Sequence, residues 1–109
     1  MAEHTLDRLA ALIAARRHAA SDTSYTRQLL DSGPERCAKK FGEEAIEAVI
    51  AAVGNDLSAV KAEAADVLYH LIVLLESKGV TLAEVCAVLD KRMGQSGLEE
   101  KAARGPGNP

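Results

Sequence analysis

Apolar side chains recur every three or four residues along most of the chain, the spacing that places them on one face of an α-helix. Four segments show this pattern over several turns and are predicted to be helices: 5–17, 34–53, 57–78 and 82–94. No segment has the alternation of apolar and polar residues that is typical of a half-buried strand. The pattern therefore predicts an all-α fold.

Capping residues stand where these helices are expected to begin. They are Thr5, Pro34, Asp56 or Ser58, and Thr81. Thr81 has Glu84 three residues later, the spacing of a capping box. Ser96 and Glu99 repeat this spacing and predict a short final helix to about residue 104.

Most connections between the predicted helices are short, so successive helices are expected to pack as antiparallel neighbours. The exception is the polar segment 19–33, interpreted as a connector in which residues 26–31 suit a turn or two of helix. This organisation predicts one domain over residues 1–104, an antiparallel bundle of four main helices plus a short C-terminal helix. The tail, 105–109, consists of glycine, proline and asparagine and is expected to be disordered.

The composition narrows the class of protein and its location. With 48% hydrophobic and 27% charged residues, and no apolar run near the ~20 residues that span a bilayer, a soluble globular protein is expected. A formal net charge of −3 argues against nucleic acid as the main partner. The N-terminus lacks the basic and then apolar pattern of a secretory signal, so we expect a cytoplasmic location and no membrane partner.

Small side chains dominate the apolar positions. Twenty alanines stand against three aromatic residues, so a monomer would bury little apolar area per residue, and a homodimer or larger assembly is expected. Cys37 and Cys86 both fall in helical patterns and lack the spacing of metal ligands. Both are therefore expected to be buried, reduced thiols.

Five carboxylates are concentrated on the second and third predicted helices: Glu43, Glu44, Glu47, Glu63 and Asp66. The three on the second helix are, by themselves, equally consistent with a solvated face. Glu63 and Asp66, however, precede the most apolar stretch of the chain, where an unpaired charge costs several kcal/mol. Antiparallel packing is expected to bring Glu63 opposite Glu47. A hard divalent cation, Mg²⁺ or Mn²⁺, would neutralise such a group.

Two basic residues share the helical arc that carries the glutamates. Lys40 and Arg36 lie about one and two turns before Glu44. Because Mg²⁺ is commonly shared between protein carboxylates and substrate phosphates, this arrangement indicates a polyphosphate substrate. The expected chemistry is attack of water on a phosphoanhydride, with one glutamate as candidate base. His70, one turn beyond Asp66, is interpreted as a hydrogen-bonded core residue.

The same residues carry a family resemblance. Glu44-x-x-Glu47, fifteen intervening residues and Glu63-x-x-Asp66 resemble the magnesium-binding signature of the all-α nucleoside triphosphate pyrophosphatase superfamily. Within it, four segments in this order are similar to the phosphoribosyl-ATP pyrophosphatase family: 24–26, 39–45, 63–71 and 96–102. The resemblance implies hydrolysis of 1-(5-phospho-β-D-ribosyl)-ATP to the AMP derivative and pyrophosphate, the second step of histidine biosynthesis. It also implies a cytoplasmic, dimeric, Mg²⁺-dependent enzyme.

The resemblance implies roles for individual residues. Those expected to bind Mg²⁺ are Glu44, Glu47, Glu63 and Asp66. Glu43 is expected to be a further ligand or to orient the attacking water, so the candidate catalytic residues are Glu43, Glu44 and Glu47. The candidate phosphate contacts, led by Lys40, are Lys40, Lys39, Arg36, Arg92, Lys101 and Arg104. The resemblance alone makes Ser24, Tyr25 and Thr26 candidate substrate contacts.

Two other functions remain open from the sequence. A pyrophosphatase of the same superfamily that acts on free nucleotides such as dUTP or dCTP would share the metal site and differ in substrate preference. A non-catalytic helical dimerisation module would leave the acidic faces merely solvated. In that case, neutral amides at Glu44 or Asp66 would not change Mg²⁺ binding.

Overall fold

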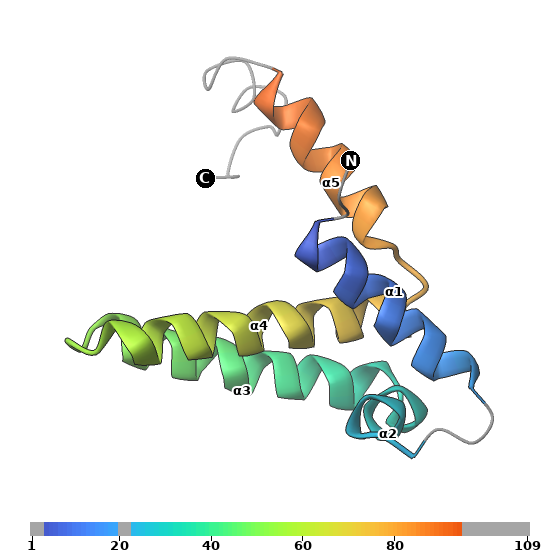
Figure 1. The fold of residues 1–109 in the computed structure, drawn as a ribbon, viewed down its shortest axis with the longest axis horizontal. Coiled ribbons are helices and arrows are strands. Elements are labelled where there is room, and N and C mark those ends of the chain that lie inside the picture. Colours follow the sequence, from blue (N-terminus) through green and yellow to red (C-terminus); the bar gives the residue numbers. More distant parts are fainter. Residues whose placement is uncertain (1–3, 20–22, 95–109) are drawn as a thin grey trace.

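The computed structural model describes residues 4–19 and 23–94, and this part of the chain is built from helices alone (Figure 1). The helices are α1 (Thr5–His18), α2 (Tyr25–Ser32), α3 (Pro34–Ala52), α4 (Leu57–Ser77) and α5 (Leu82–Met93). The predicted all-α class is confirmed. The short final helix expected after residue 94 and the tail at 105–109 lie outside the described residues.

The segment interpreted as a connector contains a packed helix, α2. The described residues therefore form five helices, one more than the four main helices predicted. The hydroxyl of Ser24 accepts a hydrogen bond from the backbone N–H of Arg27 at 3.2 Å and caps the start of α2. Leu29 is only 1% exposed, so α2 contributes to the core. Gly33, with φ 94°, turns the chain between α2 and α3 in a conformation that favours glycine.

Local capping accounts for most helix ends. Asp56 caps α4, because its carboxylate accepts hydrogen bonds from the backbone N–H groups of Ser58 and Ala59. The capping box predicted for Thr81 and Glu84 is confirmed, with both reciprocal bonds present. The prediction for α1 was one residue off: His4 is its N-cap, because the Nδ1 atom of His4 accepts from the N–H of Leu6 at 3.1 Å.

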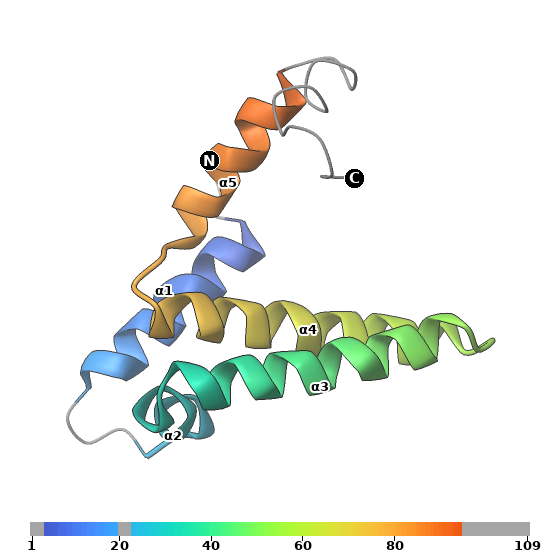
Figure 2. The same ribbon diagram turned by 180° about the vertical axis from the view of Figure 1, so that it is seen from behind.

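Helices α3 and α4 form a long antiparallel hairpin, and α1 and α2 pack at one end of it (Figures 1 and 2). The buried core lies at this end and draws side chains from all four helices: Ile13, Leu29, Cys37, Ile72 and Val73. Helix α5 leads away from the hairpin (Figure 1). The other half of the hairpin ends at the turn between α3 and α4. Among the described residues, it is held mainly by the contact of α3 with α4.

The two cysteines differ in exposure, so the expectation that both are buried was wrong for Cys86. Cys37 is 1% exposed, its Sγ atom donates to the carbonyl of Leu29 at 3.2 Å, and burial raises the pKa of its thiol. Cys86 is exposed on α5. The helical period of α5 suggested a buried apolar face, but none of the other helices in residues 4–19 and 23–94 covers this part of α5.

We expect this difference to appear in thiol labelling. The thiolate is the reactive form, so an Ellman assay on native protein should label one thiol per chain rapidly, at Cys86. Cys37 should react only after unfolding. Cys86→Ser should remove the rapid phase and leave the slow one unchanged. Equal rates for both thiols would contradict the burial of Cys37.

Candidate active site

Three carboxylates from the two helices of the hairpin converge. Glu44 belongs to α3, and Glu63 and Asp66 belong to α4. One carboxylate oxygen from each of the three lies within 4.8 Å of the others. The antiparallel hairpin produces this convergence, because it places the middle of α3 opposite the first half of α4 (Figure 2). We call Glu44, Glu63 and Asp66 the carboxylate cluster.

The electrostatics of the carboxylate cluster suit a cation. The Oε2 atom of Glu63 is buried and has no hydrogen-bond partner among the described residues. The pKa of Glu44 is raised, first by hydrogen bonding to Glu47, then by desolvation and by the charges of Glu47, Asp66 and Glu63. A buried, unpaired acceptor among like charges is costly unless a cation supplies the missing partner. The cluster can therefore bind a metal ion, and its all-oxygen donor set suits a hard one.

The two remaining glutamates of the predicted site lie beside the carboxylate cluster. Glu47 is exposed and is absent from the group of converging oxygens, although it contacts Glu44. Glu43 faces Lys40 instead, with 3.2 Å between its Oε1 atom and the Lys40 Nζ atom. Of the four metal ligands expected from the sequence, the structure thus brings three together, and the fourth is a neighbour of Glu44.

His70 lies between the core and the carboxylate cluster. Its ring is 6% exposed and stands edge-on to the rings of Tyr69 and Tyr25, at centroid distances of 5.0 and 6.2 Å. Its Nε2 atom is 4.0 Å from Glu44 Oε1. Burial first, and then the charge of Lys40, lower the pKa of His70, so the imidazole is neutral at pH 7. The prediction of a core histidine agrees with its burial, but its proximity to Glu44 could not be read from the sequence.

The segment that precedes α3 divides into structural and accessible residues. Thr26 is buried, and its hydroxyl is hydrogen-bonded to that of Tyr69. The Ser24 hydroxyl caps α2. Tyr25, in contrast, is 49% exposed while its ring contacts His70. Tyr25 is therefore the residue of this segment that is best placed to meet a ligand near the carboxylate cluster.

The candidate phosphate contacts do not all gather near the carboxylate cluster. Lys40 and Arg36 precede Glu44 on α3, and Lys39 is exposed beside Lys40. Arg92 lies on α5, which leads away from the hairpin, so the fold does not bring Arg92 to the cluster of its own chain (Figure 1). Lys101 and Arg104 lie outside the described residues.

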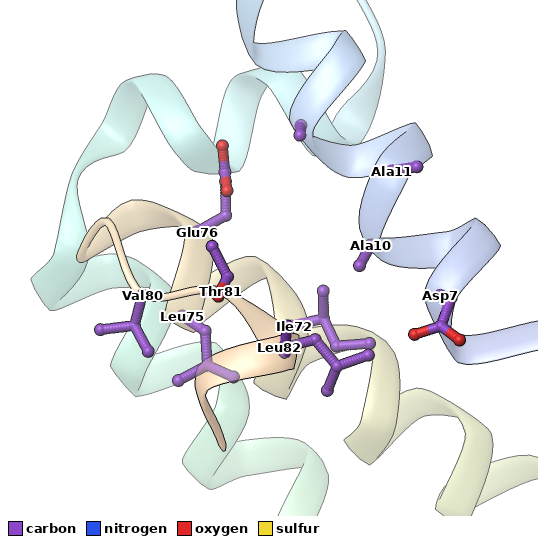
Figure 3. A pocket seen from close by; sticks show the side chains of 11 residues that line it. Asp7, Ala10, Ala11, Ile72, Leu75, Glu76, Val80, Thr81 and Leu82 are labelled. Carbon is purple, nitrogen blue, oxygen red and sulfur yellow. The ribbon is translucent and has the colours of Figure 1, made fainter. Parts of the chain in front are cut away.

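Two hollows lie near the core end of the hairpin. One, of about 230 Å³, is bounded by α2 and the first turn of α3 and is lined by Tyr25, Gln28, Leu29, Ser32 and Arg36. The other, of about 250 Å³, lies between α1, the end of α4 and the start of α5 (Figure 3). Its lining is mainly apolar, with Leu75 and Leu82 among the residues, and includes no member of the carboxylate cluster. The first hollow is the one that shares a residue, Tyr25, with the surroundings of the cluster.

The fold and this site define a class: an all-α protein whose helical hairpin presents convergent carboxylates to a cation, with basic residues beside them. Comparison with known proteins identifies the family. The profile of the phosphoribosyl-ATP pyrophosphohydrolase family matches residues 6–93. The phosphoribosyl-ATP pyrophosphatase of Cereibacter sphaeroides is 59% identical over 100 residues, which cover 92% of this chain and 97% of that protein.

Two further relatives agree with this identification. Phosphoribosyl-ATP pyrophosphatase 1 of Rhodopseudomonas palustris is 59% identical over 104 residues, covering 95% of this chain and 97% of that protein. Phosphoribosyl-ATP pyrophosphatase 1 of Bradyrhizobium diazoefficiens is 58% identical over 104 residues, covering 95% and 98%. The chain belongs to the phosphoribosyl-ATP pyrophosphohydrolase family, as the resemblance of its motifs predicted.

Proposed function

We propose that this chain hydrolyses 1-(5-phospho-β-D-ribosyl)-ATP to 1-(5-phospho-β-D-ribosyl)-AMP and pyrophosphate at the carboxylate cluster, as the second step of histidine biosynthesis. Membership of the family and the names of its relatives support the reaction. The observation that carries the placement of the site is the convergence of Glu44, Glu63 and Asp66, with one oxygen of Glu63 buried and unpaired.

The proposed cofactor is Mg²⁺, held by Glu44, Glu63 and Asp66 with Glu47 as their neighbour; Mn²⁺ has the same ligand preference. When bound, the ion would lower the pKa of the attacking water and neutralise charge on the phosphates. The protein's part is to hold the acidic side chains on two rigid helices, so that little reorganisation is needed when the substrate binds.

The glutamates and the basic residues of α3 have separate proposed roles. A glutamate of α3, among Glu43, Glu44 and Glu47, accepts the proton as water adds to phosphorus and the α–β phosphoanhydride bond breaks. Lys40 contacts the phosphates, and its ion pair with Glu43 keeps its ammonium group beside the carboxylate cluster. Lys39 and Arg36 add positive charge along α3. Arg92 and Lys101 are further candidate phosphate contacts.

The assembly is proposed to be a homodimer formed through the uncovered part of the hairpin. Apolar side chains along α3, at its C-cap and at the start of α4 form what we call the apolar stripe: Ile46, Val49, Ile50, Val53 and Leu57. Ile50 is 64% exposed and Val53 is 82% exposed. A contiguous exposed apolar surface marks an interaction site. The radius of gyration, 16.3 Å against about 13 Å for a compact chain of this length, also suits a subunit that another copy completes.

A cytoplasmic location is part of the same proposal, as expected for an enzyme of amino-acid biosynthesis. In the part of the chain that the structure describes, no helix has both the length and the hydropathy to cross a membrane.

The reaction is tested by pyrophosphate release from phosphoribosyl-ATP, made in situ from ATP and phosphoribosyl pyrophosphate by the enzyme of the preceding step. We expect turnover with Mg²⁺, and loss of turnover in EDTA that excess Mg²⁺ restores. A parallel panel of dUTP and dCTP should show little or no turnover. Hydrolysis of the free nucleotides alone would reject the biosynthetic role and favour a nucleotide-clearing pyrophosphatase.

A further inference from the structure

The hollow beside α2 has the chemistry of an anion site. Arg36 lines it and makes no ion pair with any described residue. Tyr25, which lines it from α2, is 49% exposed, and its hydroxyl has no hydrogen-bond partner in the described part of the chain. A guanidinium group and a phenol that both lack partners among the described residues offer donors to a phosphate oxygen.

The rest of the lining leaves these donors available. Leu29 supplies an apolar floor and is 1% exposed. Asp31, the acidic residue of α2, is paired with Arg27 at 3.0 Å and does not line the hollow. The hydroxyl of Ser32 donates a hydrogen bond to the carbonyl of Gln28. No carboxylate competes for Arg36 inside the hollow, and its volume of about 230 Å³ is well above that of a single water molecule.

Helix stability does not explain a basic residue at this position. Arg36 is in the first turn of α3, where the helix dipole disfavours a positive charge, and the N-cap, Gly33, has no side chain to cap the helix. An exposed arginine in this turn gains little from its own helix. Its place is better explained by a ligand that it contacts.

The hollow and the carboxylate cluster are parts of one surface. Tyr25 lines the hollow and contacts the ring of His70, whose Nε2 atom is 4.0 Å from Glu44. Arg36, Lys40 and Glu44 are spaced four residues apart on α3, so Arg36 and Glu44 are separated by about 12 Å along the helix axis. A ligand with phosphate groups at both ends can therefore contact the two sites together.

We propose that the hollow lined by Tyr25 and Arg36 binds the monophosphate of the substrate's phosphoribosyl group, while the triphosphate lies at the carboxylate cluster. This inference rests on the proposed function, since that substrate carries its two phosphate-bearing riboses on opposite sides of the adenine ring. Free nucleoside triphosphates lack the monophosphate. Arg36 is thus a specificity-determining residue that separates phosphoribosyl-ATP from free nucleotides.

The direct test is binding of the product in EDTA, which removes the contribution of a metal at the carboxylate cluster. Calorimetry should show that wild-type protein binds phosphoribosyl-AMP at least tenfold more tightly than AMP, which lacks the second phosphate. Arg36→Gln should lower the affinity for phosphoribosyl-AMP by about ten- to a hundredfold, as expected for loss of hydrogen bonds from a charged donor. The affinity for AMP should be unchanged. Tyr25→Phe should have a smaller effect in the same direction.

Kinetics give an independent readout. Arg36→Gln should raise the KM for phosphoribosyl-ATP about tenfold or more and change kcat by less than about twofold, because the contact is the same in the bound substrate and in the transition state. Lys61→Gln, which removes an exposed positive charge of α4, is the matched control and should behave as wild type. Circular dichroism and thermal melts check that each variant is folded.

The outcomes separate this inference from the proposed function. If wild-type protein hydrolyses phosphoribosyl-ATP but Arg36→Gln leaves both KM and product affinity unchanged, the assignment of the hollow is rejected and the reaction stands. If Arg36→Gln weakens the binding of AMP and of phosphoribosyl-AMP equally, Arg36 contacts the nucleotide's own phosphates, and the assignment of the hollow is also rejected. If wild-type protein does not hydrolyse phosphoribosyl-ATP, the reaction is rejected, and the binding experiment still decides whether the hollow takes a ribose phosphate.

Discussion

Glu44→Gln is expected to abolish metal-dependent hydrolysis while making the metal-free protein more stable. The substitution keeps the size of the side chain but removes one negative charge from the carboxylate cluster. If the cluster holds the catalytic cation, loss of one ligand removes several kcal/mol of transition-state stabilisation, and kcat/KM should fall by about a thousandfold or more. Mg²⁺ affinity, measured by calorimetry, should fall by at least about tenfold.

The gain in stability follows from the raised pKa of Glu44. A carboxyl with a raised pKa binds protons more readily in the folded protein than in the unfolded chain. Folding stability therefore falls as the pH rises through the interval between the ordinary and the raised pKa. In EDTA, the Glu44→Gln variant does not lose stability in this way, because it has no carboxyl to titrate at this position. Its melting temperature should therefore exceed that of wild type, and the difference should widen as the pH rises through that interval. Addition of Mg²⁺ should stabilise wild type and leave the variant almost unchanged.

A matched pair of variants separates the carboxylate cluster from general charge effects. Asp66→Asn should share the loss of activity and of Mg²⁺ affinity, whereas Asp90→Asn, at an exposed position on α5, should behave as wild type. Unchanged Mg²⁺ affinity in both Glu44→Gln and Asp66→Asn would mean that the acidic faces are only solvated. It would favour the non-catalytic dimerisation module over the enzyme.

Ile50→Asp is expected to convert a dimer into a monomer. Ile50 lies in the middle of the apolar stripe and is 64% exposed in the single chain, so the substitution costs little within the subunit. In the proposed dimer it would bury an unpaired carboxylate, which costs several kcal/mol and weakens association by about a thousandfold or more. Light scattering after size exclusion should show the mass of two chains for wild type and of one chain for the variant.

Leu12→Asp provides the matched control for the dimer experiment. Leu12 is an exposed apolar residue, 48% exposed, but it lies on α1 and outside the apolar stripe. The same introduction of a carboxylate there should leave the mass unchanged. A monomeric wild-type protein at micromolar concentration, or a dimer that survives Ile50→Asp, would contradict an interface formed through the stripe.

The elements that could be predicted from the sequence are those whose signals are local. Asp56 and the Thr81–Glu84 capping box lie within three residues of the backbone groups that they satisfy, and both act as expected. For α2, the sequence predicted only a turn or two of helix, because what stabilises this helix is not local. A helix of eight residues has little stability of its own and depends on packing, here through Leu29 in a core shared with three other helices. Such packing leaves only a weak signal in a short, polar segment.

By itself, the sequence determined the all-α class, the family and the helices that carry the acidic residues, because helical period, capping and motif order are encoded in neighbouring residues. Only the tertiary structure decided that Glu44, rather than Glu47, converges with Glu63 and Asp66, and that one oxygen of Glu63 is buried without a partner. It also decided that Thr26 is held by Tyr69 while Tyr25 and Arg36 line a common hollow. These outcomes depend on the rotation and axial offset of one helix against another. Successive residues differ by about 100° around a helix, so a small change in either brings different side chains together.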